Sequence, residues 1–315
     1  MNLKYKESTD RFTPLDGENK EMMMQDIALK IEKTIQQDPG GRGLVYWASQ
    51  GDITPAVESL NDGKHILIAT GFYILSAGAI ETDGPLGAIM LADALEKSGK
   101  KVTLIFDDHS EVIMKKGIES IGGQIYYAVV PANGSFDLAS LITPDTTHFI
   151  ALERPGRASD GDFYNFKGNN ISKYHMVLDD FFTECGLKNI TTIGIGDGGN
   201  ELGMGSVSEA VDKFVGFHRP FSCQTAAMYI ICSGVSNWAG YGIAALLSAM
   251  TGKNLMQPPE KLETMLGAIV AAGAVDGVSG KQEATVDGLE VTWEYGIYND
   301  MFHLASTIHN TGMEN

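Results

Sequence analysis

The stretch Ile190-Thr-Thr-Ile-Gly-Ile-Gly-Asp-Gly-Gly-Asn-Glu-Leu-Gly-Met-Gly205 joins an apolar run to a glycine-rich turn. Five of its last eleven residues are glycine, and Asp197, Asn200 and Glu201 lie among them. Glycine permits positive φ and a close approach of a ligand to the backbone. A strand that ends in this turn exposes main-chain N–H groups beside two carboxylates, so the stretch predicts a binding loop. A tight turn without a ligand is the alternative.

A second loop of the same kind follows the apolar run His65–Ala69. It contains Thr70-Gly71-Phe72 and, after a short excursion, Glu81-Thr-Asp-Gly-Pro85. Pro85 suits the first turn of a helix, and Asp83 can cap the free N–H groups of that turn. Glu81 has no comparable structural role, which favours a functional one.

Apolar, β-rich runs alternate with helical patterns along the chain. The predicted strands are Leu44–Trp47, His65–Ala69, Val102–Asp107, Ile125–Val130, His148–Leu152, Thr191–Ile195 and Ala226–Cys232. The predicted helices are Met22–Gln36, Leu86–Ser98, Glu111–Ile121, Tyr174–Cys185, Val207–Val215, Asn237–Met250, Pro259–Ala274 and Tyr298–Asn310, with a turn at Val286–Leu289. Strands without polar alternation, separated by single helices, indicate a parallel sheet covered on both faces. The predicted fold is therefore a three-layer α/β/α domain with a mostly parallel, Rossmann-like sheet.

The chain shows no internal repeat, low-complexity tract or Pro/Ser-rich linker. We therefore expect a polar N-terminal tail over residues 1–21 and one domain over residues 22–315. The uncharged stretch Phe221–Gly252 is long enough to cross a bilayer, but polar residues and glycines interrupt it. Two buried elements joined by a polar turn are the better interpretation, because a membrane span would leave amides unpaired.

The composition excludes several classes of partner. There are 23 Lys and Arg against 40 Asp and Glu, and the net charge of −17 opposes binding to nucleic acid or to an anionic membrane. Three cysteines without a C-x-x-C pair fit a reducing compartment, and the polar start of the sequence does not resemble a signal peptide. The expected location is the cytoplasm.

Polar residues cluster after the predicted strands. Ligands of parallel α/β sheets bind beyond the carboxyl ends of the strands. Gly71, Asp83, Arg154 and Asp197 are therefore expected to line one cleft. The next segment, Arg154–Asn165, is long and rich in both signs of charge, as functional loops often are.

Several motifs closely resemble the carboxy-terminal domain of the D-glutamate cyclase family. They are Thr70–Phe72, Glu81–Pro85, Glu153–Gly161, Gly196–Gly205 and Gly234–Trp238, and the likeness extends from about residue 22 to the end. The resemblance implies a hydro-lyase that converts D-glutamate to 5-oxo-D-proline and water. Vertebrate mitochondrial members have a separate amino-terminal domain without a counterpart in this sequence. A homo-oligomer, or a partner chain that supplies that domain, is the expected assembly.

Cyclisation needs a neutral α-amine, a general base, an acid or metal ion, and oxyanion donors. The expected catalytic residues are Asp197, Glu201 and Asp83. The expected substrate-binding residues are Gly71, Glu81, Arg154, Arg157, Asp160, Gly198, Gly199, Asn200 and Asn237.

Each of these expectations follows from side-chain chemistry. Arg154 and Arg157 can pair bidentately with the α-carboxylate, or serve as structural ion pairs. Asp197 and Glu201 can ligate Mg²⁺ or Mn²⁺, with Glu81 or Asp83 completing the shell, and without a metal Asp197 is the candidate base.

Two alternatives to this enzyme remain open. One is a non-catalytic or partner-dependent domain that binds a small carboxylate or phosphate compound. The other is a nucleotide-dependent enzyme, which the sequence disfavours because no G-x-G-x-x-G motif joins a strand to a helix. Asn237 can contact the substrate or cap the helix that follows it.

Overall fold

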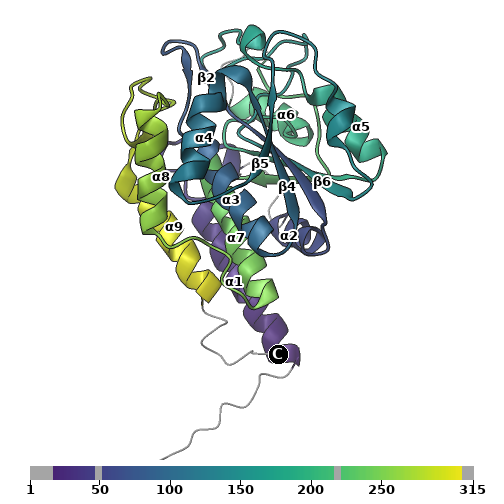
Figure 1. The fold of residues 1–315 in the computed structure, drawn as a ribbon, viewed down its shortest axis with the longest axis vertical. Coiled ribbons are helices and arrows are strands. Elements are labelled where there is room, and N and C mark those ends of the chain that lie inside the picture. The colour runs from purple at the N-terminus through teal and green to yellow at the C-terminus, as the bar shows by residue number, and fades with distance from the viewer. Residues whose placement is uncertain (1–16, 47–51, 216–220, 307–315) are drawn as a thin grey trace, which may run out of the picture.

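The computed structural model describes residues 17–46, 52–215 and 221–306. Its centre is a six-stranded sheet in the order β5-β4-β1-β6-β7-β8, and every neighbouring pair is parallel (Figure 1). The strands are β1 (His65–Thr70), β4 (Lys101–Asp107), β5 (Tyr126–Val130), β6 (Thr146–Leu152), β7 (Thr191–Gly196) and β8 (Tyr229–Cys232). Two small hairpins are formed by β2 (Tyr73–Ile74) with β3 (Ala79–Ile80), and by β9 (Thr285–Val286) with β10 (Leu289–Glu290).

Helices cover both faces of this sheet. They are α1 (Gly17–Ile35), α2 (Ile53–Asn61), α3 (Pro85–Lys97), α4 (Glu111–Ser120), α5 (Asp179–Leu187), α6 (Ser208–Ala210), α7 (Ser236–Thr251), α8 (Glu260–Ala271) and α9 (Val291–Ser306). The predicted three-layer, Rossmann-like architecture is confirmed.

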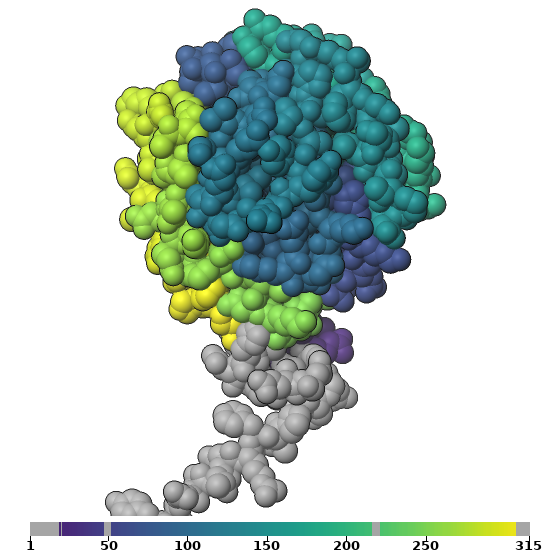
Figure 2. Space-filling model, in the orientation of Figure 1, coloured from purple at the N-terminus to yellow at the C-terminus, as the bar shows by residue number. Residues whose placement is uncertain are grey.

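Strand order determines which face each crossover helix covers. The chain moves outward from β1 to β4 and β5 through α3 and α4, and in the opposite direction from β6 to β7 through α5. Because such crossovers are right-handed, α3 and α4 share one face and α5 covers the other. Helices α1 and α9 pack on α7, and α8 packs on α4. Figure 2 shows the C-terminal helices along one flank of this face.

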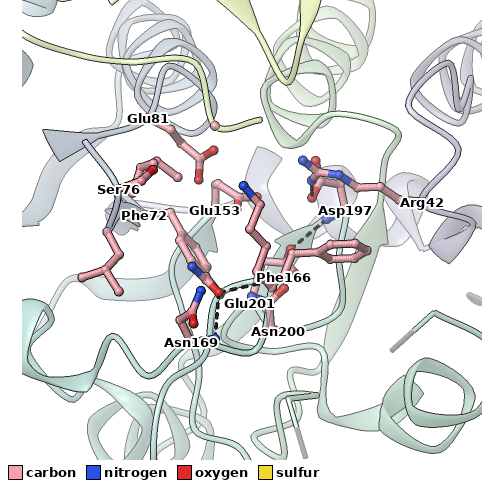
Figure 3. A pocket seen from close by; sticks show the side chains of 15 residues that line it. Arg42, Phe72, Ser76, Glu81, Glu153, Phe166, Asn169, Asp197, Asn200 and Glu201 are labelled. Carbon is pink, nitrogen blue, oxygen red and sulfur yellow. Dashed lines mark hydrogen bonds and ion pairs between the residues drawn. The ribbon is translucent and has the colours of Figure 1, made fainter. Parts of the chain in front are cut away.

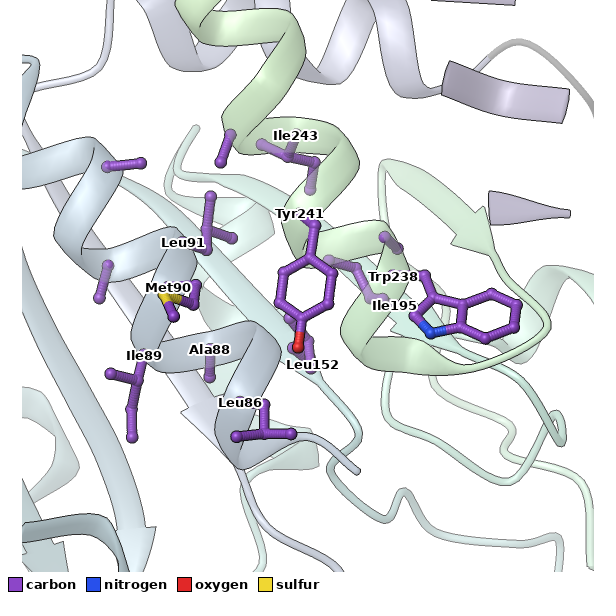
Figure 4. Close-up of a cluster of buried hydrophobic side chains, with 14 of the residues drawn as sticks. Leu86, Ala88, Ile89, Met90, Leu91, Leu152, Ile195, Trp238, Tyr241 and Ile243 are labelled. Atoms are coloured by element: carbon purple, nitrogen blue, oxygen red, sulfur yellow. The ribbon is translucent and has the colours of Figure 1, made fainter. Parts of the chain in front are cut away.

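The larger core lies between the sheet and helices α3 and α7, where Tyr241 and Leu91 are buried (Figure 4). Ile66 and Ile68 of β1 belong to this core, whereas the neighbouring Leu67 belongs to the core under α5. Side chains alternate between the two faces of a strand. A run without polar residues is therefore what a sheet covered on both faces requires.

Three predicted elements differ from the structure. Leu44–Tyr46 forms a short 3₁₀ helix instead of a strand, and Trp47 lies outside the described residues. Helix α5 begins at Asp179, because Ser172–Tyr174 is a separate 3₁₀ turn followed by extended chain. Residues 207–215 are a succession of 3₁₀, α and π turns.

One helix of the structure, α2, was not predicted, and the ends of other elements differ. Helix α9 begins at Val291 instead of Tyr298. Residues 307–310 of that predicted helix lie outside the described part. Helix α1 extends back to Gly17, into the predicted tail. The stretch Phe221–Gly252 divides into β8 and α7 as predicted, and no helix in the described ranges is both long and apolar enough to cross a bilayer.

The strand order reverses between β1 and β6. Ligands of open α/β sheets bind at such a reversal, beyond the carboxyl ends of the strands. Gly71, which follows β1, donates its backbone N–H to the carbonyl oxygen of Glu153, which follows β6, over 3.1 Å. The fold thus brings these two loops together at the position where a ligand is expected.

Candidate functional site

A cavity of about 250 Å³ lies at the carboxyl edge of the sheet (Figure 3). It is lined by Arg42, Phe72, Ile74, Leu75, Ser76, Glu81, Glu153, Asn165, Phe166, Lys167, Asn169, Asp197, Asn200, Glu201 and Gly277. Pockets for drug-sized ligands typically measure about 300–1,000 Å³, so this one suits a smaller molecule. Its wall combines aromatic rings, amides and four carboxyl side chains, which is typical of a site for a small polar ligand.

The glycine-rich loop after β7 is held by its own glutamate. Glu201 Oε1 accepts the backbone N–H groups of Asp197 (3.3 Å) and Gly198 (2.8 Å), and Oε2 accepts that of Gly199 (2.7 Å). Gly199 has φ +91°, and a Cβ atom there would lie 2.3 Å from a methyl group of Val211. The loop therefore needs both the carboxylate and the glycine to present Asp197 to the cavity.

Three buried carboxyl groups meet at the inner wall of the cavity. Asp83, Glu153 and Asp197, here called the carboxylate triad, offer oxygens that all lie within 4.8 Å of one another. Glu153 accepts a hydrogen bond from Ser236 Oγ at 2.6 Å. The carboxyl group of Asp197 also shares a hydrogen bond with that of Asp287. Glu153 also has φ +46°, a conformation that non-glycine residues rarely adopt.

Arg42 supplies positive charge beside the triad. Its guanidinium pairs with Asp197 Oδ1, and its Nη2 lies 2.9 Å from Asp287 Oδ1. The guanidinium also lies over the Phe166 ring, 5.8 Å from the centroid. Arg42 therefore links the loop after α1 to the loop after β7 and to the hairpin β9–β10.

Burial and charge repulsion shift the acidities of these groups. Burial raises the pKa of Glu81, Asp83 and Glu153 well above the ordinary range, and neighbouring carboxylates add to this rise. The pKa of Asp197 is raised for the same reasons, although Arg42 opposes the shift. The raised pKa values favour the protonated forms of these carboxyl groups, and perturbed pKa values of this kind cluster at functional sites.

Asp83 and Asn237 cap each other's helices. Asp83 accepts the backbone N–H groups of Ser236 (2.9 Å) and Asn237 (2.8 Å) at the start of α7. Asn237 Oδ1 accepts those of Gly84 (2.9 Å) and Gly87 (2.7 Å) at the start of α3. Each residue was expected to cap its own helix, but each mainly caps the other one. Asp83 bonds only the N–H of Gly84 in its own segment, and Asn237 caps α3 instead of α7.

The structure distributes the predicted site residues unequally. Glu81, Asp197, Asn200 and Glu201 line the cavity, and Asp83 lies behind its wall in the triad. The remaining predicted residues are absent from the lining: Gly71, Arg154, Arg157, Asp160, Gly198, Gly199 and Asn237. Gly71, Gly198, Gly199 and Asn237 nevertheless bond to segments that form the wall.

Arg154 and Arg157 already have acidic partners in the structure. Arg154 is fully buried and makes a two-pronged pair with Asp107, in which Nη2 lies 3.0 Å from Oδ1. Arg157 pairs with Asp180 at the surface. Asp160 is exposed and accepts the hydroxyl hydrogen bond of Tyr164 at 2.6 Å. The sequence predicted one cleft lined by Gly71, Asp83, Arg154 and Asp197. Of these four residues, Asp197 alone lines the cavity.

Sequence reasoning missed Arg42, Glu153 and Asp287 as site residues. Arg42 lies 155 positions from Asp197 in a loop without a motif, so no local signal marks it. Glu153 directly follows the predicted strand His148–Leu152, and this position at the carboxyl end of a strand could have marked it as a site residue. Asp287 stands before Gly288 in the predicted turn, where an acidic residue is unremarkable.

The chain is an α/β protein whose small acid-lined cavity lies at the reversal of a parallel sheet, where open α/β sheets commonly bind their ligands. A family model described as D-glutamate cyclase-like, C-terminal, matches residues 31–301, and the chain belongs to this family. It is 32% identical over 299 residues to the mitochondrial D-glutamate cyclase of Homo sapiens, in a match that covers 82% of this chain and 48% of the human protein. The chain therefore spans about half the length of that relative.

Proposed function

We propose that this chain is a hydro-lyase that converts D-glutamate to 5-oxo-D-proline and water. The observation that carries the proposal is a small cavity whose buried carboxyl groups have raised pKa values. Membership of the D-glutamate cyclase-like family and the name of the human relative support the choice of substrate.

The reaction requires two proton transfers. The α-nitrogen forms a bond to the side-chain carboxyl carbon, and one oxygen of that carboxyl group leaves. Two of the three ammonium protons end on the departing oxygen as water, and the third stays on the amide nitrogen. A pair of carboxyl groups, one ionised and one protonated, can accept and return these protons and is unchanged after the cycle.

The cavity contains residues for each of these tasks. Asp197 and Glu81 line it from different loops and are our candidates for proton transfer. Arg42 and Lys167 are the lining cations that can face the carboxylates of the substrate, and Asn200 offers an amide. The rings of Phe72 and Phe166 add an apolar wall that limits the access of water.

A second candidate is a partner-dependent ligand-binding domain. It is favoured by one observation, that the match covers 48% of the human relative. In that case D-glutamate binds to the chain, but turnover needs a further polypeptide.

Incubation of the purified chain with D-glutamate and with L-glutamate distinguishes these functions. We expect 5-oxo-D-proline from D-glutamate, and an increase in melting temperature with D-glutamate or 5-oxo-D-proline but not with a nucleotide. Stabilisation without turnover would favour the partner-dependent domain. If D-glutamate neither stabilises the chain nor is turned over, with or without Mg²⁺ or Mn²⁺, both functions are contradicted.

A further inference from the structure

The cations on the cavity wall, Arg42 and Lys167, differ in their partners. Arg42 pairs with Asp197 and with Asp287, so its charge offsets carboxyl groups of the protein itself. The ammonium of Lys167 has no ion pair or hydrogen bond with any residue in the described ranges. A lysine ammonium offers three N–H donors and one positive charge. Lys167 therefore presents a charge that the surrounding protein does not compensate.

The turn that carries Lys167 is held by hydrogen bonds around Asn165. Asn165 Oδ1 accepts the backbone N–H groups of Lys167 (3.1 Å) and Asn169 (3.0 Å). The carbonyl oxygen of Asn165 accepts that of Gly168 (2.8 Å), and Gly168 has φ +75°. The turn therefore fixes the backbone from which Lys167 and Asn169 both line the cavity.

Asn169 adds an amide to this part of the wall. Its side-chain amide has no hydrogen bond with any other residue in the part of the chain that the structure describes. Figure 3 shows Asn169 on the opposite side of the cavity from Glu81. Ammonium and amide N–H groups are donors that a carboxylate accepts. We call Lys167 and Asn169 the cationic corner.

The two carboxyl groups of D-glutamate need different surroundings. The side-chain carboxyl group is attacked by the amine, so it must lie near a proton donor. The raised pKa values of Glu81 and Glu153 favour the protonated forms that donate. The α-carboxylate does not react and stays ionised, so contact with a wall of carboxyl groups is unfavourable unless a cation compensates it. The cationic corner provides that compensation.

We propose that Lys167, with the amide of Asn169, binds the α-carboxylate of the substrate. The amine and the side-chain carboxyl group then face Asp197 and Glu81. The identity of the substrate in this inference rests on the proposed function. Lys167, in place of the already paired Arg42, is the residue that selects amino acids with a free α-carboxylate.

The binding of 5-oxo-D-proline and of 5-oxo-D-prolinamide isolates this contact, because the two compounds differ only at the α-carboxyl group. Their affinities for the full chain are measured by isothermal titration calorimetry. Lys167→Met keeps the length of the side chain and removes its charge. Lys173→Met is the matched control, because Lys173 is exposed in the next 3₁₀ turn and is absent from the cavity lining.

We expect Lys167→Met to lower the affinity for 5-oxo-D-proline at least ~10-fold, because a charge-assisted hydrogen bond is lost. The affinity of Lys167→Met for 5-oxo-D-prolinamide, and both affinities of Lys173→Met, should equal those of the wild type. The KM for D-glutamate should rise in Lys167→Met by a similar factor with little change in kcat, as expected for a binding contact that does not change during the reaction. Circular dichroism checks that each variant folds.

The proposal is overturned if the wild type does not bind 5-oxo-D-proline at millimolar concentration, or if folded Lys167→Met binds it as tightly as the wild type. Equal losses for the acid and the amide, or the same loss in Lys173→Met, would also overturn it.

Asn169→Asp is a second variant in case Lys167→Met does not fold. Its negative charge should weaken the binding of 5-oxo-D-proline and spare that of the amide, and unchanged binding of both compounds would overturn the proposal. A selective loss of 5-oxo-D-proline binding without turnover of D-glutamate supports the cationic corner and removes the hydro-lyase function alone. Turnover by Lys167→Met at an unchanged KM leaves that function and removes the corner.

Discussion

Unusual backbone conformations hold single acidic residues in the site. Glu153 has φ +46° and Asp287 has φ +53°. Such conformations cost on the order of 1–3 kcal/mol each and persist where the surrounding structure fixes them. Glu153 joins the triad, and Asp287 lies beside Arg42, so both conformations place a carboxyl group where it contributes to the charge of the site.

Gly199 allows a direct test of the loop. Gly199 and Gly161 both have φ +91°, but an added Cβ meets Val211 at 2.3 Å in the first case and nothing within 4 Å in the second. Both alanine variants bear the strain of positive φ, roughly 1 kcal/mol, and Gly199→Ala bears the clash as well. In chemical denaturation, Gly199→Ala should therefore lower the free energy of unfolding by clearly more than Gly161→Ala. Equal losses would mean that the loop accommodates a side chain.

At the scale of elements, the two most buried helices start together. The exchange of caps between Asp83 and Asn237 fixes the start of α3 beside the start of α7, directly behind the cavity wall. The first N–H groups of a helix lack partners within it, and here each helix obtains acceptors from the other.

Asn237→Ala should destabilise the fold more than the loss of an ordinary cap. It removes the partner of the Gly87 N–H group and that of the Thr82 carbonyl oxygen in a buried position, at about 1–3 kcal/mol each, whereas the N–H group of Gly84 keeps Asp83 as its acceptor. We expect a loss of roughly 2–4 kcal/mol in the free energy of unfolding, against about 1 kcal/mol for a surface cap. A loss below 1 kcal/mol, measured by urea denaturation, would contradict the exchanged capping.

The sequence predicts elements well where burial is uniform. All six strands of the sheet were predicted because their apolar runs are continuous, as a doubly covered sheet demands. Helix α2 was missed because Thr54 and Pro55 at its start suggest a loop, although Pro is tolerated in a first turn. Leu44–Tyr46 is apolar but too short for its period to distinguish a strand from a 3₁₀ turn.

At the scale of the whole molecule, the site joins segments that no local pattern connects. The rule for parallel sheets located the edge, and the glycine loop located Asp197. Arg42 and Asp287 arrive from the loop after α1 and from the hairpin β9–β10, and their approach depends on tertiary packing. The same packing places Arg154 in an ion pair with Asp107. The sequence alone could not distinguish this structural role of Arg154 from contact with a substrate.

His175 connects the hairpin β2–β3 to Asp107 at the end of β4, and the protonation of its ring depends on pH. Burial lowers the pKa of His175 from 6.5 to about 4, although Asp107 opposes the shift. Its neutral ring accepts the N–H of Tyr73, in the hairpin beside the cavity. Between pH 6.5 and about 4, His175 is protonated in the unfolded chain but neutral in the folded chain. Stability from this residue is therefore present above pH 6.5 and is lost as the pH falls.

The variant His175→Gln isolates this contribution from that of other titrating groups. The difference in free energy of unfolding between wild type and variant should narrow from pH 7.5 to pH 4.5 by up to roughly 3 kcal/mol, at about 1.4 kcal/mol per pKa unit. A difference that is constant over this range, in denaturant titrations, would show that His175 does not titrate as inferred.

Cyclisation of D-glutamate in the acidic cavity is the proposal on which the assigned roles of the site residues depend. Its most direct test is ¹³C NMR of D-glutamate labelled at the side-chain carboxyl carbon, incubated with the wild type, with Asp197→Asn and with Asp62→Asn. Asp62 is exposed at the amino end of β1, away from the cavity lining. We predict that the carboxylate signal converts to the lactam signal with the wild type and Asp62→Asn, and about 10²- to 10⁴-fold more slowly with folded Asp197→Asn. Conversion at an equal rate by Asp197→Asn, or no conversion by the wild type with Mg²⁺ or Mn²⁺ present, would contradict the claim.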